Sequence, residues 1–442
     1  MSKWGQDQDA SPVPLAQLDN TERFHAWSQE LRFNGDFGDH WLEYTVGGFY
    51  MNQYGDYTAR VDLNYAGIDF LHGPDTTPSI SKALYADVSI HPTSRWTISG
   101  GLRGSWDEKI YTYFRRDPDG SIPPVCAFFL GAPTAGPTGI GNAPNCLLNG
   151  LYNLEGKYSG SRLDYRAVTD YRFSDQVLAY ASISTGYMGG GINPRPFYGP
   201  ATGPCGPYQY DAQGHVIPSP PCNQVTSFNP ETLTTFEGGL KTDWFDHRMR
   251  LNGAVFYNDF NNIIFALSAC PSSPCLAPTN VGKAKVDGFE LETTIRPVPG
   301  ALIDGSLSYI HVMYNKASVA PAGLTGNETF PYTPDWTYSF GAQYDFDMGW
   351  GILTPRIEGN YRSAIFNATN NSSWSRQPGL FLANARLTYA SPNGGWRIWV
   401  EAQNVFDKYY FLSLSDITQS LGAQTGVPGL PRTFSVTLKK SW

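Results

Sequence analysis

The feature that most constrains the fold is a two-residue alternation of apolar and polar side chains, which recurs from residue 23 to the end of the chain. In the final segment, 432–442, Phe434, Val436 and Leu438 share one face, while threonine, serine and lysine occupy the other. A period of two places successive side chains on opposite faces of a β-strand. The pattern therefore predicts an all-β protein whose strands have one apolar and one hydrated face.

The spacing of these segments predicts one continuous antiparallel sheet. About fifteen strands are expected, near residues 23–35, 41–54, 80–92, 96–114, 158–173, 176–187, 231–244, 249–264, 282–296, 301–314, 335–346, 351–363, 379–390, 396–405 and 432–442. Short turns alternate with long connections rich in Gly, Pro, Ser and Asn, so all the long loops fall at one end of the sheet. Outer-membrane β-barrels have this arrangement, with short periplasmic turns and long extracellular loops. A β-propeller would instead show a repeat of about 40–50 residues, which is not visible.

Composition agrees with a barrel in lipid. Aromatic residues make up 14% of the chain and charged residues only 16%, against a usual charged fraction of about 25%. The longest apolar runs are far shorter than the roughly 20 residues that a membrane helix needs. The net charge is −8 and basic residues are scattered, which argues against nucleic acid as a partner. Residues 1–22 are polar, contain no signal sequence and are expected to be the tail of a loop.

The six cysteines fall in pairs within three of the long connections. The expected disulfides are Cys126 with Cys146, Cys205 with Cys222, and Cys270 with Cys275. Each pair could close within its own loop, which favours these bonds among the fifteen possible connectivities. Such bonds indicate an oxidising compartment. The alternative is a set of free thiols.

A series of short motifs runs along most of the chain. It comprises Ser28-Gln29-Glu30-Leu31-Arg32, Thr185-Gly186-Tyr187-Met188-Gly189-Gly190-Gly191-Ile192-Asn193-Pro194, Asn229-Pro230-Glu231 followed by Glu237, Asn280-Val281-Gly282 followed by Gly288 and Glu290, Tyr332-Thr333-Pro334, Gln403-Asn404-Val405-Phe406-Asp407, and a closing strand that ends at Trp442. In content and order these motifs resemble those of TonB-dependent receptors of the bacterial outer membrane. Taken alone, each motif is weak and is explained by strand register and turn chemistry.

The resemblance implies more strands than the sequence contains. Complete receptors of this family have a 22-stranded barrel preceded by a plug domain, and the plug carries a short box that contacts TonB. Neither plug nor box is recognisable, so residues 23–442 are expected to be the carboxyl-terminal part of the barrel, from a truncated gene, a mis-assigned start or a deliberate fragment. An odd number of antiparallel strands would also need a parallel seam to close.

The resemblance implies energy-coupled uptake of a scarce nutrient, such as a ferric siderophore or a similar large complex. Its expected partners are membrane lipid, the machinery that inserts outer-membrane barrels and reads the last strand, an extracellular ligand, and TonB through the missing plug. Candidate ligand-binding residues are the loop aromatics Tyr198, Tyr208, Tyr332 and Trp374.

Two other classes of function are compatible with parts of the sequence or can be tested against it. A passive pore, or a remnant of a receptor gene, would share the barrel and need no plug. An enzyme is not supported, because no nucleophile or zinc motif occurs and the seven histidines sit on separate segments. No cofactor and no metal site are predicted. The paired carboxylates Glu290 and Glu292 are interpreted as part of a hydrated lumen wall.

Overall fold

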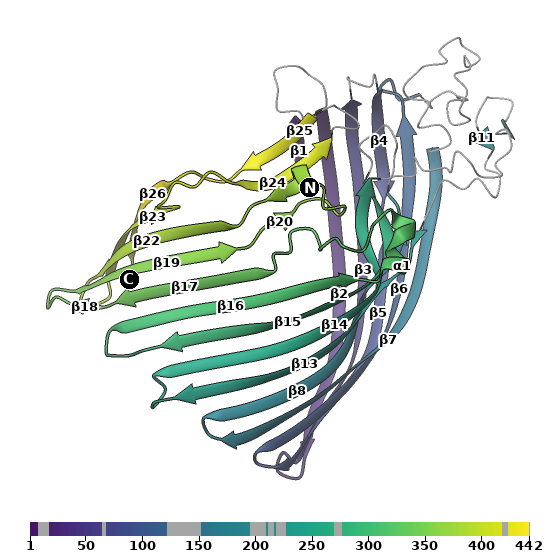
Figure 1. The fold of residues 1–442 in the computed structure, drawn as a ribbon. Coiled ribbons are helices and arrows are strands. Elements are labelled where there is room, and N and C mark those ends of the chain that lie inside the picture. The colour runs from purple at the N-terminus through teal and green to yellow at the C-terminus, as the bar shows by residue number, and fades with distance from the viewer. Residues whose placement is uncertain are drawn as a thin grey trace.

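The computed structural model describes residues 1–7, 17–63, 68–121, 152–194, 209–210, 216–217, 227–268, 276–417 and 423–441. One large antiparallel sheet dominates it and curves around a central space (Figure 1). Within these ranges, the few helical segments are too short to cross a membrane.

The large sheet has eighteen strands, of which β4 (Ile68–Thr76) and β18 (Phe346–Asp347) are short additions at its ends. The other sixteen form an antiparallel meander in chain order: β1 (Ser2–Asp7), β2 (Gln17–Phe37), β3 (Leu42–Leu63), β5 (Ser79–Thr93), β6 (Trp96–Arg116), β7 (Tyr152–Ser174), β8 (Val177–Met188), β13 (Glu231–Trp244), β14 (Met249–Ser268), β15 (Leu276–Ile295), β16 (Ala301–Tyr314), β17 (Trp336–Tyr344), β19 (Ile352–Arg362), β22 (Leu380–Ala390), β23 (Trp396–Gln403) and β26 (Thr433–Lys440).

Smaller elements lie at the end of the sheet that carries the long connections. Four two-stranded ribbons are β9 (Gly191–Ile192) with β12 (Ser227–Phe228), β10 (Gln209–Tyr210) with β11 (Val216–Ile217), β20 (Ile365–Phe366) with β21 (Arg376–Gln377), and β24 (Phe411–Ile417) with β25 (Ala423–Pro428). Three short helical turns lie within the described residues, namely α1 (Lys316–Val319), η4 (Ala320–Ala322) and η5 (Ser373–Ser375).

All fifteen predicted strands are present, and the all-β prediction is confirmed. Residues 1–22 differ from the expected loop tail, because they contain β1 and the start of β2, which pair from Ser2 with Glu22 to Asp7 with Gln17. With β1 the meander has an even number of strands, so the first and last run antiparallel and the argument from a parallel seam does not apply. In the described ranges, β1 pairs with β2 and β26 pairs with β23, while no pairing joins β1 to β26.

The strand register places one apolar face outward. Across the first strands, Leu31 pairs with Gly48, Gly48 with Leu84, Leu84 with Gly104, and Gly104 with Leu163, which makes a row of alternating leucine and glycine. On β6, two exposed tryptophans on this face, Trp96 and Trp106, are ten residues apart. Ten residues span about 33 Å along a strand, or about 25 Å across the membrane at the usual tilt. The two tryptophans therefore mark the edges of the lipid-facing band.

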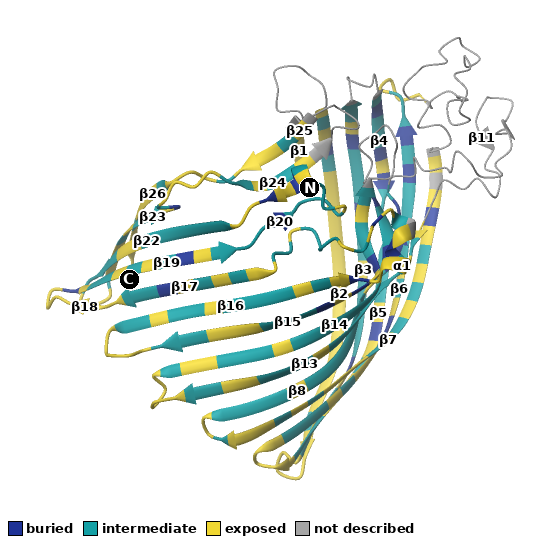
Figure 2. Ribbon diagram, viewed as in Figure 1, coloured by how far each residue is buried: buried dark blue, intermediate teal, exposed yellow. Residues whose placement is uncertain are grey.

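The largest fully buried side chains lie above this band, although single buried positions also occur along the strands (Figure 2). One group, which includes Asp75, Tyr113 and Arg115, lies where β4 meets β6. The other is a hydrophobic cluster that joins the ends of β14, β15 and β16 to α1 and the turn that follows it, and it contains Ile263, Val281, Ala284, Tyr314, Val319 and Leu324. Both cores therefore organise the end of the sheet that carries the long loops.

Candidate functional site at the extracellular mouth

The candidate site begins where β6 leaves the lipid-facing band. Beyond Trp106 the strand continues to Arg116, and its odd-numbered side chains lie on the face opposite the two tryptophans. That face lines the interior of the curved sheet, which we call the lumen. The residues from Asp107 to Arg115 therefore lie at the extracellular mouth of the lumen, outside the membrane-spanning part of β6.

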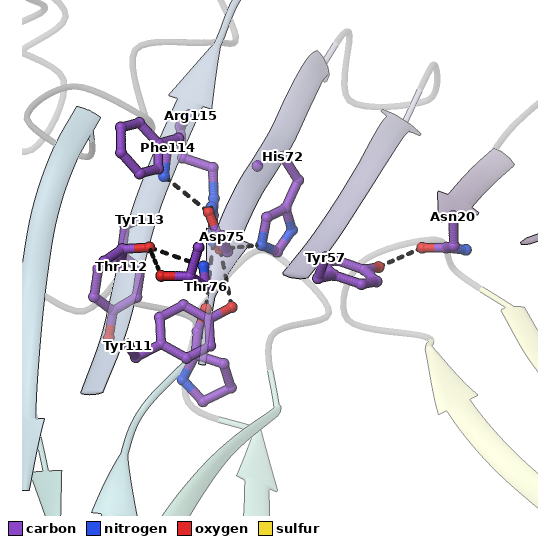
Figure 3. Close-up of polar contacts among 12 residues, drawn as sticks. Asn20, Tyr57, His72, Asp75, Thr76, Tyr111, Thr112, Tyr113, Phe114 and Arg115 are labelled. Carbon is purple, nitrogen blue, oxygen red and sulfur yellow. Dashed lines mark hydrogen bonds and ion pairs between the residues drawn. The ribbon is translucent and has the colours of Figure 1, made fainter. Parts of the chain in front are cut away.

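Asp75 is the centre of a buried polar network at this mouth (Figure 3). The carboxylate is fully buried and is surrounded by donors on two strands. They are His72 Nε2 at 2.6 Å, Arg115 Nη1 at 2.7 Å, the backbone N–H of Phe114 at 2.8 Å and the hydroxyl of Tyr111 at 2.9 Å. Arg115 is itself only 1% exposed. We call these five residues the Asp75 network.

The electrostatics of the network favour a charged carboxylate. Burial alone would raise the pKa of Asp75, but the hydrogen bonds and positive charges of His72 and Arg115 outweigh burial and hold the pKa below its usual value. A buried ion pair is costly to break, because removing one partner leaves the other charge unpaired in a medium that solvates it poorly. The network therefore locks β4 against β6.

A β-bulge in β4 allows this convergence. Between the pairs Tyr57 with Asp75 and Ala59 with His72, β4 has one residue more than β3. Without the extra residue, positions three apart would point to opposite faces of the strand. Gly73 lies in the bulge with φ of +98°, and a Cβ there would collide with the carbonyl oxygen of Tyr57. The glycine therefore lets His72 and Asp75 share one face.

Three side chains of β6 also hold the segment that follows β8. Lys109 Nζ donates to the carbonyl of Gly190 at 2.8 Å, the Tyr113 hydroxyl to that of Asn193 at 2.6 Å, and Arg115 Nη2 to that of Pro194 at 3.4 Å. Burial raises the pKa of Tyr113, so its hydroxyl remains a donor over the whole physiological range. We call residues 190–194 the anchored segment.

The glycine motif of this segment has a clear steric reason. Gly190 is buried, and a Cβ there would collide with the carbonyl oxygen of Phe228 and crowd the ring of Tyr158. Gly189 is less confined, since its Cβ would lie 3.3 Å from Lys109 Nζ, and Gly186 has open space around it.

Two further motif residues brace the rim of the mouth. Glu231 Oε2 accepts the backbone N–H of Ile264 at 2.8 Å, next to an irregularity in the pairing of β14. Asn404 is buried, and its amide contacts the backbone of Lys408 and the carbonyl of Leu430, which closes the base of the loop between β23 and β26. Phe406, which follows in the same motif, is 60% exposed.

Other motif residues form the lumen wall. Tyr187 donates to Asp107, and Glu237 accepts from the Tyr180 hydroxyl at 2.7 Å. Glu290 pairs in register with Ala254 and Ser308, on the lumenal face. At Gly288 a side chain would collide with the carbonyl oxygen of Tyr309. Pro230 lies between β12 and β13, while Trp442 is outside the described residues.

The predicted ligand-binding aromatics are only partly placed. Tyr332 is 51% exposed, and its backbone N–H donates to the carbonyl of Phe366 in β20. Trp374 is half-buried in η5, on the connection between β20 and β21. The structure thus puts both in two connections that contact each other, but it records no direct contact between the two rings. Tyr198, Tyr208 and all six cysteines fall outside the described ranges.

Sequence reasoning missed the Asp75 network. The sequence predicts a loop around His72 and Asp75, because nothing in it marks the bulge at Gly73. A signal was present on β6, where Tyr111, Tyr113 and Arg115 continue the lumenal face past the lipid band. Large side chains on a lumenal face so far beyond the membrane indicate that the mouth is packed and ordered.

Comparison with known proteins agrees with this geometry. The family model "TonB dependent receptor-like, beta-barrel" matches residues 3–405. The catecholate siderophore receptor Fiu of Escherichia coli K12 is 26% identical over 217 residues, covering 48% of this chain and 26% of Fiu. The pesticin receptor of Yersinia pestis is 24% identical over 426 residues, covering 93% of this chain and 51% of that receptor. The chain thus spans about half or less of the length of these relatives.

The fold is also that of solved receptor structures. The ferric yersiniabactin uptake receptor FyuA from Yersinia pestis aligns with a TM-score of 0.72 at 19% sequence identity, over 97% of this chain and 55% of FyuA. The predictions of a barrel and of a receptor rather than an enzyme are therefore confirmed. The chain belongs to the family of TonB dependent receptor-like β-barrels of the bacterial outer membrane.

Proposed function

We propose that the protein to which this barrel belongs imports a ferric siderophore or a similar metal complex across the outer membrane, driven by TonB. The observation that carries the proposal is the family match over residues 3–405. Its relatives include receptors named for catecholate siderophores and for ferric yersiniabactin. The network and rim contacts at the mouth support it, since a rigid rim is needed to present binding loops.

Ligand recognition is assigned to the loops at the extracellular mouth. Tyr332 and Trp374 belong to two connections that are held together by Asn371, whose amide exchanges hydrogen bonds with the backbone of Thr329 at 2.8 and 3.0 Å. Aromatic faces and hydroxyls of this kind can stack on and hydrogen-bond to the aromatic or polar groups of a metal complex. Tyr198 and Tyr208 stay candidates on the strength of the sequence alone.

The partners follow from the same proposal. TonB would act through a plug domain, and the insertion machinery would read β26, where Phe434, Val436 and Leu438 present an exposed apolar face. Whether a plug and further strands precede Met1 stays a prediction, which the DNA upstream of the codon for Met1 tests directly.

Uptake of ⁵⁵Fe bound to a panel of siderophores tests the proposal. The complete gene is expressed in a strain that lacks its own ferric siderophore receptors, with and without TonB. We expect saturable uptake of at least one complex that disappears without TonB. Uptake that is linear in concentration and independent of TonB would instead establish a passive pore.

A further inference from the structure

A cavity of about 300 Å³, lined by both charged and apolar residues, lies in the lumen wall at the periplasmic end, far from the Asp75 network. It is lined by the ends of β7, β8, β13 and β14, next to the short turn between β7 and β8 and the short turn between β13 and β14. The side chains that matter for its chemistry are Arg172, Asp175, Lys241, Asp243, Arg250 and Asn252. Nothing in the uptake mechanism proposed above uses this cavity.

The charges of the cavity do not cancel. Asp243 Oδ2 binds Arg250 Nη2 at 3.2 Å and His247 Nδ1 at 2.9 Å, so this carboxylate already neutralises Arg250. Arg172 and Lys241 have no ion pair and no side-chain hydrogen bond with any residue that the structure describes, and Lys241 only approaches the ring of Tyr180 at 5.6 Å.

One carboxylate is left to balance these two cations. Asp175 lines the cavity but makes no ion pair with either Arg172 or Lys241. Among the residues that line the cavity, Arg172, Lys241 and Arg250 against Asp175 and Asp243 leave one surplus positive charge. A concave site with surplus positive charge and an adjacent amide, that of Asn252, attracts a negatively charged group.

We propose that this cavity is a binding site for an oxyanion, a carboxylate or a phosphate, which enters from the periplasm. The planar guanidinium of Arg172 suits two parallel hydrogen bonds to such a group, and Lys241 adds a compact positive charge. A cavity of about 300 Å³ is at the lower end of the range for ligand sites. It therefore fits a small free anion or one acidic side chain of a polypeptide rather than a large complex.

Calorimetric titration of the full chain, refolded in detergent at low salt, tests the site with three probes. They are inorganic phosphate, succinate, and an end-blocked pentapeptide with two glutamates. We expect at least one to bind saturably, and Arg172→Gln or Lys241→Gln to weaken binding about tenfold, since each removes a hydrogen bond to a charged group. Arg386→Gln, which removes a lumenal cation on β22 outside the cavity, is the matched control and leaves binding unchanged.

The probes also separate the two sources of the anion. Binding of phosphate or succinate assigns the site to a free anion, and binding of the peptide alone assigns it to an acidic polypeptide segment. The proposal is overturned if no probe binds to the folded chain, if the double variant R172Q/K241Q binds as the unmodified chain does, or if R386Q loses affinity equally. Heat-modifiable migration on a denaturing gel confirms that each variant is folded.

Discussion

Asp75 holds two strands together at the extracellular mouth, although no sequence motif surrounds it. Its four donors come from positions that are three and about forty residues away, and their convergence depends on one extra residue in β4. Alternation of polar and apolar side chains predicts which face a residue is on, but a bulge inverts the face without changing composition. The lumenal position of Glu290, by contrast, follows from alternation alone and agrees with the register.

Removing the charge of Asp75 should loosen the mouth without unfolding the barrel. Asp75→Asn leaves Arg115 as a buried, unpaired cation, at a cost of about 3–5 kcal/mol. We expect faster hydrogen exchange at the upper ends of β4 and β6, measured by mass spectrometry. The control is Asp69→Asn, which breaks an ion pair with the exposed Arg60 and should cost at most about 1 kcal/mol. Equal exchange rates in the two variants would show that the Asp75 network stabilises the mouth no more than an exposed ion pair does.

The same network sets a dependence on pH. Because the pKa of Asp75 is lower in the folded state than in the unfolded chain, its stabilisation is fully present above about pH 4 and is lost only as pH falls through the folded-state pKa. The measured quantity is the hydrogen exchange rate at the tips of β4 and β6, divided by the rate of the unfolded chain at the same pH. This ratio should stay constant between pH 7 and 5. It should rise steeply in more acidic buffer, and Asp75→Asn should abolish that rise.

The membrane-spanning strands could be predicted from the sequence, but the short strands β1, β4 and β9 could not. Strands 301–314 and 379–390 were located within a residue or two from alternation and turn residues alone. β4 and β9 were missed, because they are held by side chains of β6 and by bulges rather than by a hydrophobic face of their own. β1 was missed because six residues are too few to show a period.

The anchored segment should depend on the hydroxyl of Tyr113. Tyr113→Phe leaves the buried carbonyl of Asn193 without this donor, at a cost of about 1–3 kcal/mol. We expect faster limited proteolysis near residues 190–194. Tyr165→Phe, on the lipid-facing side of β7 where the hydroxyl has no described partner, should leave the cleavage rate unchanged. Cleavage that is no faster in the Tyr113 variant would contradict the anchoring role.

The long connections carry a separate prediction. If the cysteines pair within their own loops, peptide mapping without reduction links Cys126 to Cys146, Cys205 to Cys222 and Cys270 to Cys275. A link between two different loops would contradict this pairing. Residues 126, 146, 205, 222, 270 and 275 are outside the described ranges, so the pairing stays a prediction.

For the whole molecule, composition and alternation were enough to predict a membrane barrel, because the bilayer imposes one apolar face on every strand.

The assignment of the lipid-facing side can be tested by placing a charge at the midplane of the membrane. Leu102→Arg places a charge on the lipid face of β6, close to the midpoint between Trp96 and Trp106, and should cost about 2–4 kcal/mol, seen as a lower urea midpoint in lipid vesicles. Ser308→Arg, on the lumenal face opposite Glu290, should be nearly neutral. A similar loss in both would mean that the two faces are assigned wrongly.

The separation of Trp96 and Trp106 has a consequence for the lipid environment. Phe37 and Trp27 on β2, also exposed and ten residues apart on the same face, repeat the spacing. A band of about 25 Å is shorter than the roughly 30 Å hydrocarbon core of an average bilayer, and such hydrophobic mismatch is relieved by thinning of the lipid around the protein. The barrel is therefore matched to a thin membrane, and it should insert faster into vesicles of short-chain lipids than into those whose acyl chains are long.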